Sequence, residues 1–178
     1  FELTGHRPRD ELVYVSHALA GRQVSRFSKR DDRTLFLFCW REREPAPIPG
    51  DDAGRRAALR REFAGMRWEA PAILAAMENV KDIYFDRVSQ IEMPRWSKGR
   101  VALVGDAAAC VSLLAGEGSG LAMAEAYVLA GEIARAGSDH AAAFSRYEER
   151  MKPFLAAKQE SARKFASSFV PETALTHS

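Results

Sequence analysis

The residues of this chain that could do chemistry gather between positions 100 and 130. Asp106 follows an apolar run over residues 101–104 and a glycine, Gly105. In open α/β sheets, ligands bind beyond the carboxyl ends of the strands, and an ionised carboxylate only accepts hydrogen bonds. The pattern predicts that Asp106 contacts a ligand with sugar-like hydroxyls, while Gly105 lets the ligand approach the backbone. For an aspartate taken alone, a helix cap or a turn is the commoner role.

Three glycines follow Asp106 at a spacing that suits the same ligand. Gly116, Gly118 and Gly120 stand in the segment Ala-Gly-Glu-Gly-Ser-Gly, directly before a helix expected over residues 119–136. A helix N-terminus offers unpaired N–H groups and about half a positive charge, which attract phosphate or an electron-rich ring. Each signal alone is weak. The order of strand, Gly-Asp, short apolar loop, GxG and Ala-rich helix is far more specific.

Other reactive side chains are scattered. The chain has four histidines: His6, His17, His140 and His177. They are predicted to be structural or surface residues, because isolated histidines lack the partners that catalysis or metal binding needs. The two cysteines, Cys39 and Cys110, have no CxxC spacing and are predicted to be small buried thiols. We therefore predict no metal site and assign no catalytic side chain.

Composition excludes several classes of protein. The chain has 178 residues, 47% of them hydrophobic, which is enough for a real core. Its 26 basic and 24 acidic residues leave a formal charge of +2, with no basic, aromatic-rich cluster, so nucleic acid is a poor candidate partner. No apolar run approaches the roughly 20 residues of a membrane span, and no signal peptide is evident. We expect a soluble, cytoplasmic protein, cut from something larger because it starts at once with strand-like sequence.

The first half predicts a sheet followed by helices. Alternation over residues 12–15, 24–27 and 35–40 indicates three antiparallel strands, with turns at 21–22 and 31–33. The third strand is apolar on both faces, which predicts that both are covered. Asp51 is expected to cap a helix whose apolar residues are Ala58, Leu59, Phe63 and Met66. Its arginines are predicted to form a solvated face: Arg55, Arg56, Arg60 and Arg61.

The sequence continues with a short helix from Pro71 to about residue 79 and a strand over 83–92. Residues 101–104 are expected to form a short buried strand. Gly137 closes the following helix and Asp139 caps the next one. Within that last helix, Pro153 is expected to cause a kink or a restart, and the tail after Phe169 is expected to fray. The same helix carries apolar residues at helical spacing that are predicted to face the core: Phe144, Tyr147, Met151, Phe154 and Leu155.

The segments 100–108, 114–123 and 126–130 resemble the second half of the group A flavoprotein monooxygenases, the p-hydroxybenzoate hydroxylase-like family. Residues 1–40, including 7–12, are less specifically similar to that family's substrate-covering sheet. The resemblance implies an α+β fold. Residues 1–92 would form a substrate-binding antiparallel sheet with two short helices, and residues 93–178 the C-terminal portion of a Rossmann-like FAD-binding domain with long C-terminal helices.

The resemblance also implies roles for individual residues. Asp106 would accept a hydrogen bond from a ribityl hydroxyl of FAD, and the backbone over 116–121 would lie along the pyrimidine edge of the flavin, where the helix dipole favours negative charge on the reduced ring. An intact relative would hydroxylate an aromatic or polyketide-like substrate with NAD(P)H and O2. The implied cofactor-binding residues are Gly105, Asp106, Gly116, Glu117, Gly118, Ser119, Gly120 and Leu121.

This sequence departs from the family in three places. The loop over 110–113 lacks the usual prolines and is predicted to be less rigid, Ala109 stands where many relatives have His or Tyr, and the GxGxxG and Asp-Gly segments are missing. We therefore expect little turnover from this chain alone. Two alternatives remain: a non-catalytic module that binds a small molecule or a partner chain, and a related halogenase or dehydrogenase. Unpaired strand edges and apolar faces predict a homo-oligomer, or association with a missing N-terminal part.

Overall fold

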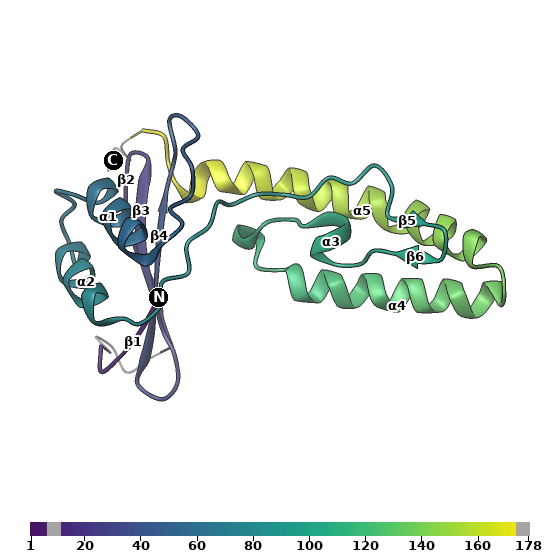
Figure 1. Cartoon of the computed structure of the whole chain (residues 1–178), viewed down its shortest axis with the longest axis horizontal. Coiled ribbons are helices and arrows are strands. Elements are labelled where there is room, and N and C mark those ends of the chain that lie inside the picture. Colours follow the sequence, from purple (N-terminus) through teal and green to yellow (C-terminus); the bar gives the residue numbers. More distant parts are fainter. Residues whose placement is uncertain (7–11, 174–178) are drawn as a thin grey trace. The chain divides into compact units, whose positions relative to one another are not determined.

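The structure is a computed structural model that describes residues 1–6 and 12–173 (Figure 1). The chain divides into two compact units: unit 1 comprises residues 1–87 and the chain from Ser167 onward, and unit 2 comprises Val88–Ala166. The predicted class is confirmed, because the chain is α+β with an antiparallel sheet and C-terminal helices. Residues 7–11, part of the resemblance to a substrate-covering sheet, and His177 lie outside the described residues.

Unit 1 is built on a four-stranded antiparallel sheet in the order β1-β4-β3-β2. The strands are β1 (Glu2–Thr4), β2 (Tyr14–Leu19), β3 (Arg22–Ser28) and β4 (Arg33–Trp40). Strands β2, β3 and β4 are the three predicted from the alternation. The β3–β4 turn has positive φ at both Asp31 (59°) and Asp32 (53°), the conformation that suits the twist of a tight hairpin.

Two helices cover one face of this sheet. They are α1 (Asp52–Glu62) and α2 (Ala70–Ala76), followed by a 3-10 turn, η1 (Met77–Asn79). Asp51 caps α1, as predicted, because its Oδ1 accepts the Gly54 N–H at 2.7 Å. The buried cluster that joins the helices to the sheet consists of Val24, Phe36, Leu59, Phe63, Met66, Ala70, Ile73, Met77 and Ile83.

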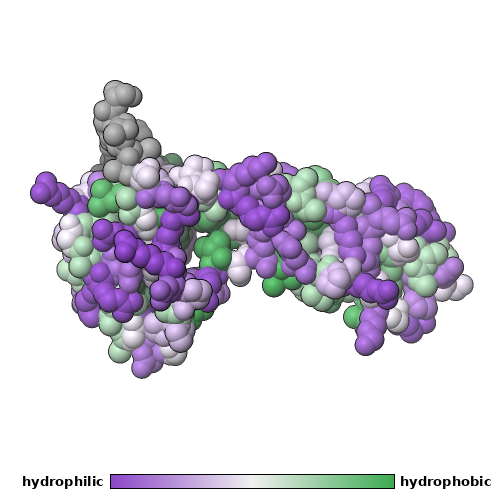
Figure 2. All heavy atoms as spheres, turned by 90° about the horizontal axis from the view of Figure 1, so that it is seen from above, coloured by the Kyte–Doolittle hydropathy of each residue, from purple (hydrophilic) through white to green (hydrophobic). Residues whose placement is uncertain are grey.

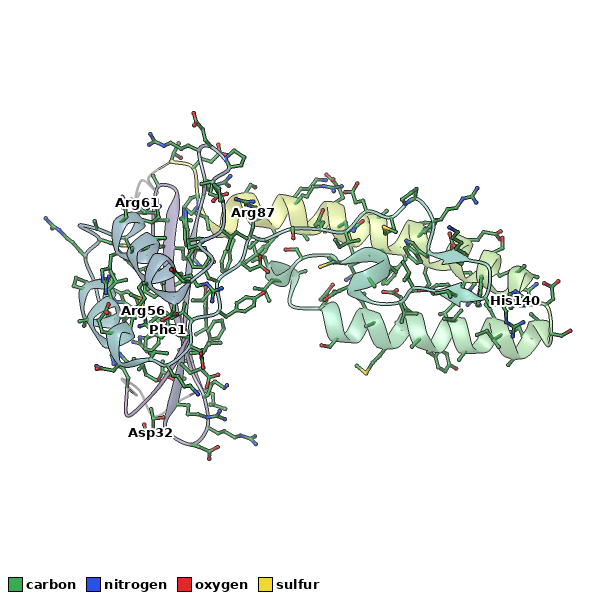
Figure 3. All side chains as sticks on the ribbon, viewed as in Figure 1. Phe1, Asp32, Arg56, Arg61, Arg87 and His140 are labelled. Atoms are coloured by element: carbon green, nitrogen blue, oxygen red, sulfur yellow. The ribbon has the colours of Figure 1, made fainter. Side chains whose placement is uncertain are left out.

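The arginine face of α1 is only half solvated, so that prediction is wrong for two of its four members. Arg55 donates to the carbonyls of Pro49 and Ile83. Arg56, labelled in Figure 3, is 12% exposed; it pairs with Asp52 and donates to the carbonyls of Met77 and Val80. The Arg56 guanidinium thus satisfies carbonyls where the chain leaves η1. Arg60 and Arg61 are exposed, as expected.

The end of the described chain is held against the sheet of unit 1. Arg41 donates from Nε to the Val170 carbonyl at 2.6 Å and from Nη2 to the Ser167 carbonyl at 3.0 Å. The Gly21 N–H donates to the Pro171 carbonyl at 2.7 Å, and Val170 is buried. The predicted fraying after Phe169 is therefore wrong through residue 173. Residues 174–178 lie outside the described part.

Unit 2 consists of a small hairpin and long helices. Strands β5 (Ser97–Lys98) and β6 (Val101–Ala102) pair in antiparallel fashion. They are followed by α3 (Asp106–Ala109), η2 (Leu113–Ala115), α4 (Gly118–Ala136) and α5 (His140–Phe169), the last three residues of which fall in unit 1. Figure 1 shows α4 and α5 running antiparallel along the unit. The predicted start of α5 is confirmed, because Asp139 Oδ1 accepts the Ala142 N–H at 3.0 Å.

Two predicted strands of this region are not found as expected. Residues 83–92 form no strand; Ile91 donates its N–H to the Cys110 carbonyl, but the segment has no ladder of such bonds among the described residues. Only two residues of the run 101–104 are in β6, and Val101 is 63% exposed. The run is apolar, but within the described chain β6 pairs only with β5, in a sheet of two strands. The run is therefore not enclosed by neighbouring strands as a buried strand would be.

The stripe along α5 packs largely as predicted. Phe144, Tyr147, Met151 and Leu155 are buried, whereas Phe154 is exposed and lies against Lys158. The expected restart at Pro153 does not occur, because α5 is one continuous helix. Pro153 is exposed, so water can satisfy the carbonyl that loses its helical partner, while buried residues on both sides hold the helix together.

A cluster of one glutamate and three arginines joins α4 to α5. Glu132 of α4 is almost completely buried and pairs with Arg135, Arg146 and Arg150 at 2.8, 2.9 and 2.6 Å. Hydrogen bonds from Arg150 and Arg146 lower the pKa of the Glu132 carboxyl below its ordinary value. Because Arg146 and Arg150 belong to α5, this ionised carboxylate ties the two helices together.

The Glu132 cluster predicts a pH-dependent contribution to stability. A carboxyl whose pKa is lower in the folded than in the unfolded chain adds stability above its unfolded pKa, and this stability is lost as pH falls through the folded pKa. We expect Glu132→Gln to lower the melting temperature at pH 7 and the gap from wild type to close in acid. Glu160→Gln, which removes an exposed carboxylate paired with Arg163 and Lys164, is the matched control and should cost less. Equal losses for both variants at pH 7 would contradict the assignment.

Candidate functional site

The structure places Asp106 beside the start of α4. Asp106 is the first residue of α3, and Gly105, with φ 63° and ψ −143°, precedes it as the N-cap. A Cβ built on Gly118 would lie 3.8 Å from Asp106 Oδ1. The exposed carboxylate of Asp106 therefore faces the first residue of α4, and the two features that the spacing singled out lie together.

The glycine turn forms the N-terminal end of α4. Gly116 adopts the left-handed conformation, Glu117 occupies the N-cap position, and α4 starts at Gly118. No side chain caps this end, since the Glu117 carboxylate pairs instead with Lys158 at 2.8 Å. The first N–H groups of an α-helix have no intrahelical partner, and in α4 no side chain of the described residues caps them. Ser119 and Gly120 are exposed in the first turn, and Leu121 is buried in the core of unit 2.

Space remains open around this end of α4. A Cβ on Gly116 or Gly120 would meet no atom within 4 Å. Within the described residues, the site thus presents a carboxylate acceptor next to backbone donors that no side chain caps. That donor set fits a molecule whose hydroxyl-bearing chain is joined to an electron-rich ring edge.

Two glutamines that the sequence interpretation missed hold the loop between α3 and α4. Gln159 of α5 donates from Nε2 to the carbonyls of Ile91 at 2.8 Å and Cys110 at 3.1 Å, and Gln90 donates to the Val111 carbonyl at 2.6 Å. These amides, rather than prolines, fix the loop, which was expected to lack rigidity. Gln159 continues the buried spacing of Met151 and Leu155, a signal by which it could have been found.

The cysteines are partly rather than fully buried, so the prediction of buried thiols is only half right. Burial raises the pKa of Cys39 to about 11. Burial and the negative charge of Asp106 raise the pKa of Cys110 above its ordinary value. Both remain protonated at neutral pH and are poor nucleophiles.

The described histidines pack against aromatic rings. His6 contacts Phe36, His17 contacts Trp68, and His140 contacts Phe144, with ring centroids 5.1 to 5.8 Å apart. Among the described residues, no group of three or more His, Cys, Asp or Glu side chains could hold a metal ion. In the same part of the chain, no helix is long and apolar enough to cross a membrane.

An open cavity of about 610 Å³ lies elsewhere in unit 2, between the β5–β6 hairpin and the start of α5, where Figure 3 labels His140. Its lining includes Arg95, Lys98, Phe144 and Glu148, but neither Asp106 nor the glycine turn. Glu148 is already satisfied by Ser97 and Lys152. We therefore place the candidate site at Asp106 rather than in this cavity.

Comparison with known proteins decides the family. A family model described as an FAD binding domain matches residues 9–161. The chain belongs to this FAD binding domain family. A curated flavin-dependent monooxygenase from an unknown prokaryotic organism is 39% identical over 154 residues, which cover 86% of this chain and 40% of the relative. A flavin-dependent monooxygenase of Legionella longbeachae is 42% identical over 110 residues, 62% of this chain and 28% of the relative.

Solved structures share the fold of this FAD binding domain chain. The crystal structure of tetracycline destructase Tet(55) matches 91% of the chain and 43% of its own length, with a TM-score of 0.81 and 36% identity. The structure of Klebsiella pneumoniae R204Q HpxO complexed with FAD matches 84% of the chain and 39% of its own length, with a TM-score of 0.61 and 28% identity. The resemblance to flavoprotein monooxygenases is thus confirmed, and the chain spans less than half the length of these relatives.

The backbone at Gly105 predicts an unequal response to alanine. Gly105→Ala would place a Cβ 3.1 Å from the Ala122 Cβ in a conformation that side chains avoid, so we expect a loss of roughly 1–3 kcal/mol in unfolding free energy or more. Gly116→Ala, at a left-handed position with open space, should cost only about 1 kcal/mol. Urea unfolding of both variants provides the measurement, and a costlier Gly116→Ala would refute the packing argument.

Proposed function

We propose that this chain supplies the part of an FAD-dependent monooxygenase that contacts the ribityl chain and ring of the flavin. The single observation that carries the proposal is the Asp106 carboxylate facing the uncapped N-terminus of α4. The family match and the FAD-complexed HpxO structure support FAD as the ligand. The proposed contact residues are Gly105, Asp106, Gly116, Glu117, Gly118, Ser119, Gly120 and Leu121.

In this proposal the residues of the chain bind and orient. Asp106 accepts a hydrogen bond from a ribityl hydroxyl, and the first N–H groups of α4 donate to the pyrimidine edge of the flavin. The partial positive charge of the helix end favours the electron-rich form of the ring. When bound, the flavin supplies the redox chemistry itself, with NAD(P)H as reductant and O2 as co-substrate. Because the flavin supplies this chemistry, the protein needs few acid or base side chains, which is consistent with histidines that are scattered along the chain.

The proposed substrate is an aromatic or polyketide-like small molecule. The likeness to a tetracycline destructase supports a fused-ring substrate, since its name states action on such a molecule. The face of the unit 1 sheet opposite α1 and α2 is the proposed substrate-covering surface, on which Tyr14, 43% exposed, lies beside Phe27. The sequence contains no GxGxxG turn for the FAD pyrophosphate, so we expect the purified 178-residue chain to show little turnover.

Riboflavin tests the proposed contact, because it carries the ribityl chain and ring without the nucleotide. A hydrogen bond to a charged group contributes about 1.5–3 kcal/mol, so Asp106→Ala should weaken riboflavin binding by about 10- to 100-fold. Asp106→Asn keeps an acceptor oxygen and should lose much less. Quenching of riboflavin fluorescence measures each dissociation constant.

Asp86→Ala is the control for the riboflavin titration, since Asp86 is an exposed aspartate of unit 1 and should not affect affinity. Riboflavin affinity that is unchanged in Asp106→Ala would refute the flavin-contact role. Sustained NADPH oxidation coupled to product hydroxylation by the wild-type chain would refute the expectation that it is incomplete alone.

A second candidate function, association with a protein partner, is favoured by the outer face of α4. Met123 and Tyr127 are 68% and 83% exposed one turn apart on α4. In the view of Figure 2, the hydrophobic groups of each unit lie in patches separated by hydrophilic side chains. An exposed apolar helix face favours burial against another surface. We propose that it supports self-association of this chain or docking of a polypeptide that corresponds to the part of the relatives that this chain does not span.

Tyr127→Glu tests the association. A charge in the middle of an apolar interface carries a large desolvation cost, so this variant should shift the purified chain toward monomer in light scattering at matched concentration. Tyr84→Glu, at an equally exposed tyrosine of unit 1, should leave the molar mass unchanged. A wild-type chain that is monomeric at all concentrations would remove the self-association proposal.

A further inference from the structure

Glu125 is a buried carboxylate that the flavin-contact proposal does not use. It lies on α4, is 1% exposed, and faces the core that contains Leu121 and Tyr147. Burial raises the pKa of its carboxyl above the ordinary value, although hydrogen bonds from Tyr147 and Gly105 offset part of that effect. Because burying a carboxylate is costly, its hydrogen-bond partners show what the fold gains from it.

The first partner of Glu125 is the residue that precedes Asp106. Glu125 Oε2 accepts the Gly105 N–H at 2.9 Å. The carbonyl of Gly105 in turn accepts the N–H groups of Ala108 and Ala109, at 2.9 and 3.0 Å. Both polar groups of Gly105 are therefore fixed, one by α4 and the other by α3.

The second partner orients the Glu125 carboxylate. Tyr147 of α5 is fully buried, and its hydroxyl lies 2.9 Å from Glu125 Oε2 and 3.1 Å from the Leu103 carbonyl. The Tyr147 ring packs on Trp96 with centroids 5.5 Å apart. Glu125 and Tyr147 thus hold the backbone on both sides of Val104, directly before Asp106.

We propose that Glu125 is a positioning residue for Asp106. It acts through the Gly105 N–H, so that the Asp106 carboxylate is held in the direction of Gly118 and meets the ribityl chain of a flavin. Tyr147 orients Glu125 in this arrangement. The inference rests on the proposed flavin contact, but the hydrogen bond to Gly105 can be tested without any flavin.

The first experiment compares riboflavin with lumiflavin, which has the same ring but no ribityl chain. We expect Glu125→Ala to weaken riboflavin binding about tenfold, the value of one hydrogen bond of about 1.4 kcal/mol, and to leave lumiflavin binding within about twofold. Glu125→Gln keeps an oxygen acceptor of the same reach and should restore riboflavin affinity to within about threefold of wild type. Unchanged riboflavin affinity in Glu125→Ala, or equal losses for both flavins, would overturn the positioning role.

The second experiment needs no ligand. Amide hydrogen exchange at Gly105 should be at least about tenfold faster in Glu125→Ala than in Glu125→Gln, because only the latter keeps an acceptor for that N–H. If the wild-type chain binds neither flavin, the proposed function fails, and exchange at Gly105 still decides whether Glu125 fixes this turn. Equal exchange rates in the two variants would overturn the inference.

A third variant covers the case in which Glu125→Ala fails to fold. Tyr147→Phe keeps the buried ring but removes the hydroxyl that orients Glu125. We expect a smaller loss of riboflavin affinity than in Glu125→Ala, again without an equal loss for lumiflavin. Tyr147→Phe with riboflavin affinity and Gly105 exchange both equal to wild type would show that Tyr147 does not orient Glu125 for this role.

Discussion

The close approach of Gly105 to α4 is the constraint on which the candidate site depends. A Cβ at Gly105 would lie only 3.1 Å from the Ala122 Cβ, in a positive-φ conformation that side chains rarely adopt, so glycine favours the packing of the turn after β6 against the helix. Because the turn is packed there, the residue that follows it faces the first residue of α4. A strand end and a helix end that are separated along the chain thereby contribute to one surface. The acceptor is then the Asp106 carboxylate, and the donors are backbone N–H groups at the start of α4.

Helix α4 reverses the usual distribution of polarity. The residues that it buries within the described chain include two carboxylates, Glu125 and Glu132, whereas Met123 and Tyr127 are exposed. The two carboxylates are satisfied in different ways: Glu132 by three arginines that reach water, and Glu125 by a phenol and a backbone amide. A helix with polar groups buried on one face and apolar groups exposed on the other is typical of an element packed between two layers, of which the described residues supply one.

Local signals in the sequence predicted the helices well. Asp51, Gly137 and Asp139 mark helix ends by chemistry that acts within one turn, and the structure has those ends. The errors occurred where a distant partner decides the outcome. The run 101–104 is apolar enough for a buried strand, but no parallel neighbour pairs with it in the described chain. Arg56 looked like a surface residue because its carbonyl acceptors, Met77 and Val80, lie in another element.

The same reasoning applies to the site. Asp106 and the glycine turn could be singled out because glycine and aspartate at strand and helix ends have few roles. Glu125 could not, because a glutamate on a helix is usually solvated and only the packed structure shows its hydrogen bond to Gly105. Gln159 lies between these cases, since its position on the α5 stripe marked its burial but not its acceptors.

The attachment of residues 167–173 to the first sheet has a consequence for biosynthesis. Arg41 and Gly21 are synthesised before unit 2, whereas the carbonyls of Val170 and Pro171 to which they donate are made only after all of unit 2. Domains generally fold in the order of their synthesis, but here the sheet of unit 1 keeps those donors without their native acceptors until translation has passed the second unit. A nascent chain that stalls before Ser167 would leave this part of the sheet open to solvent and to other chains.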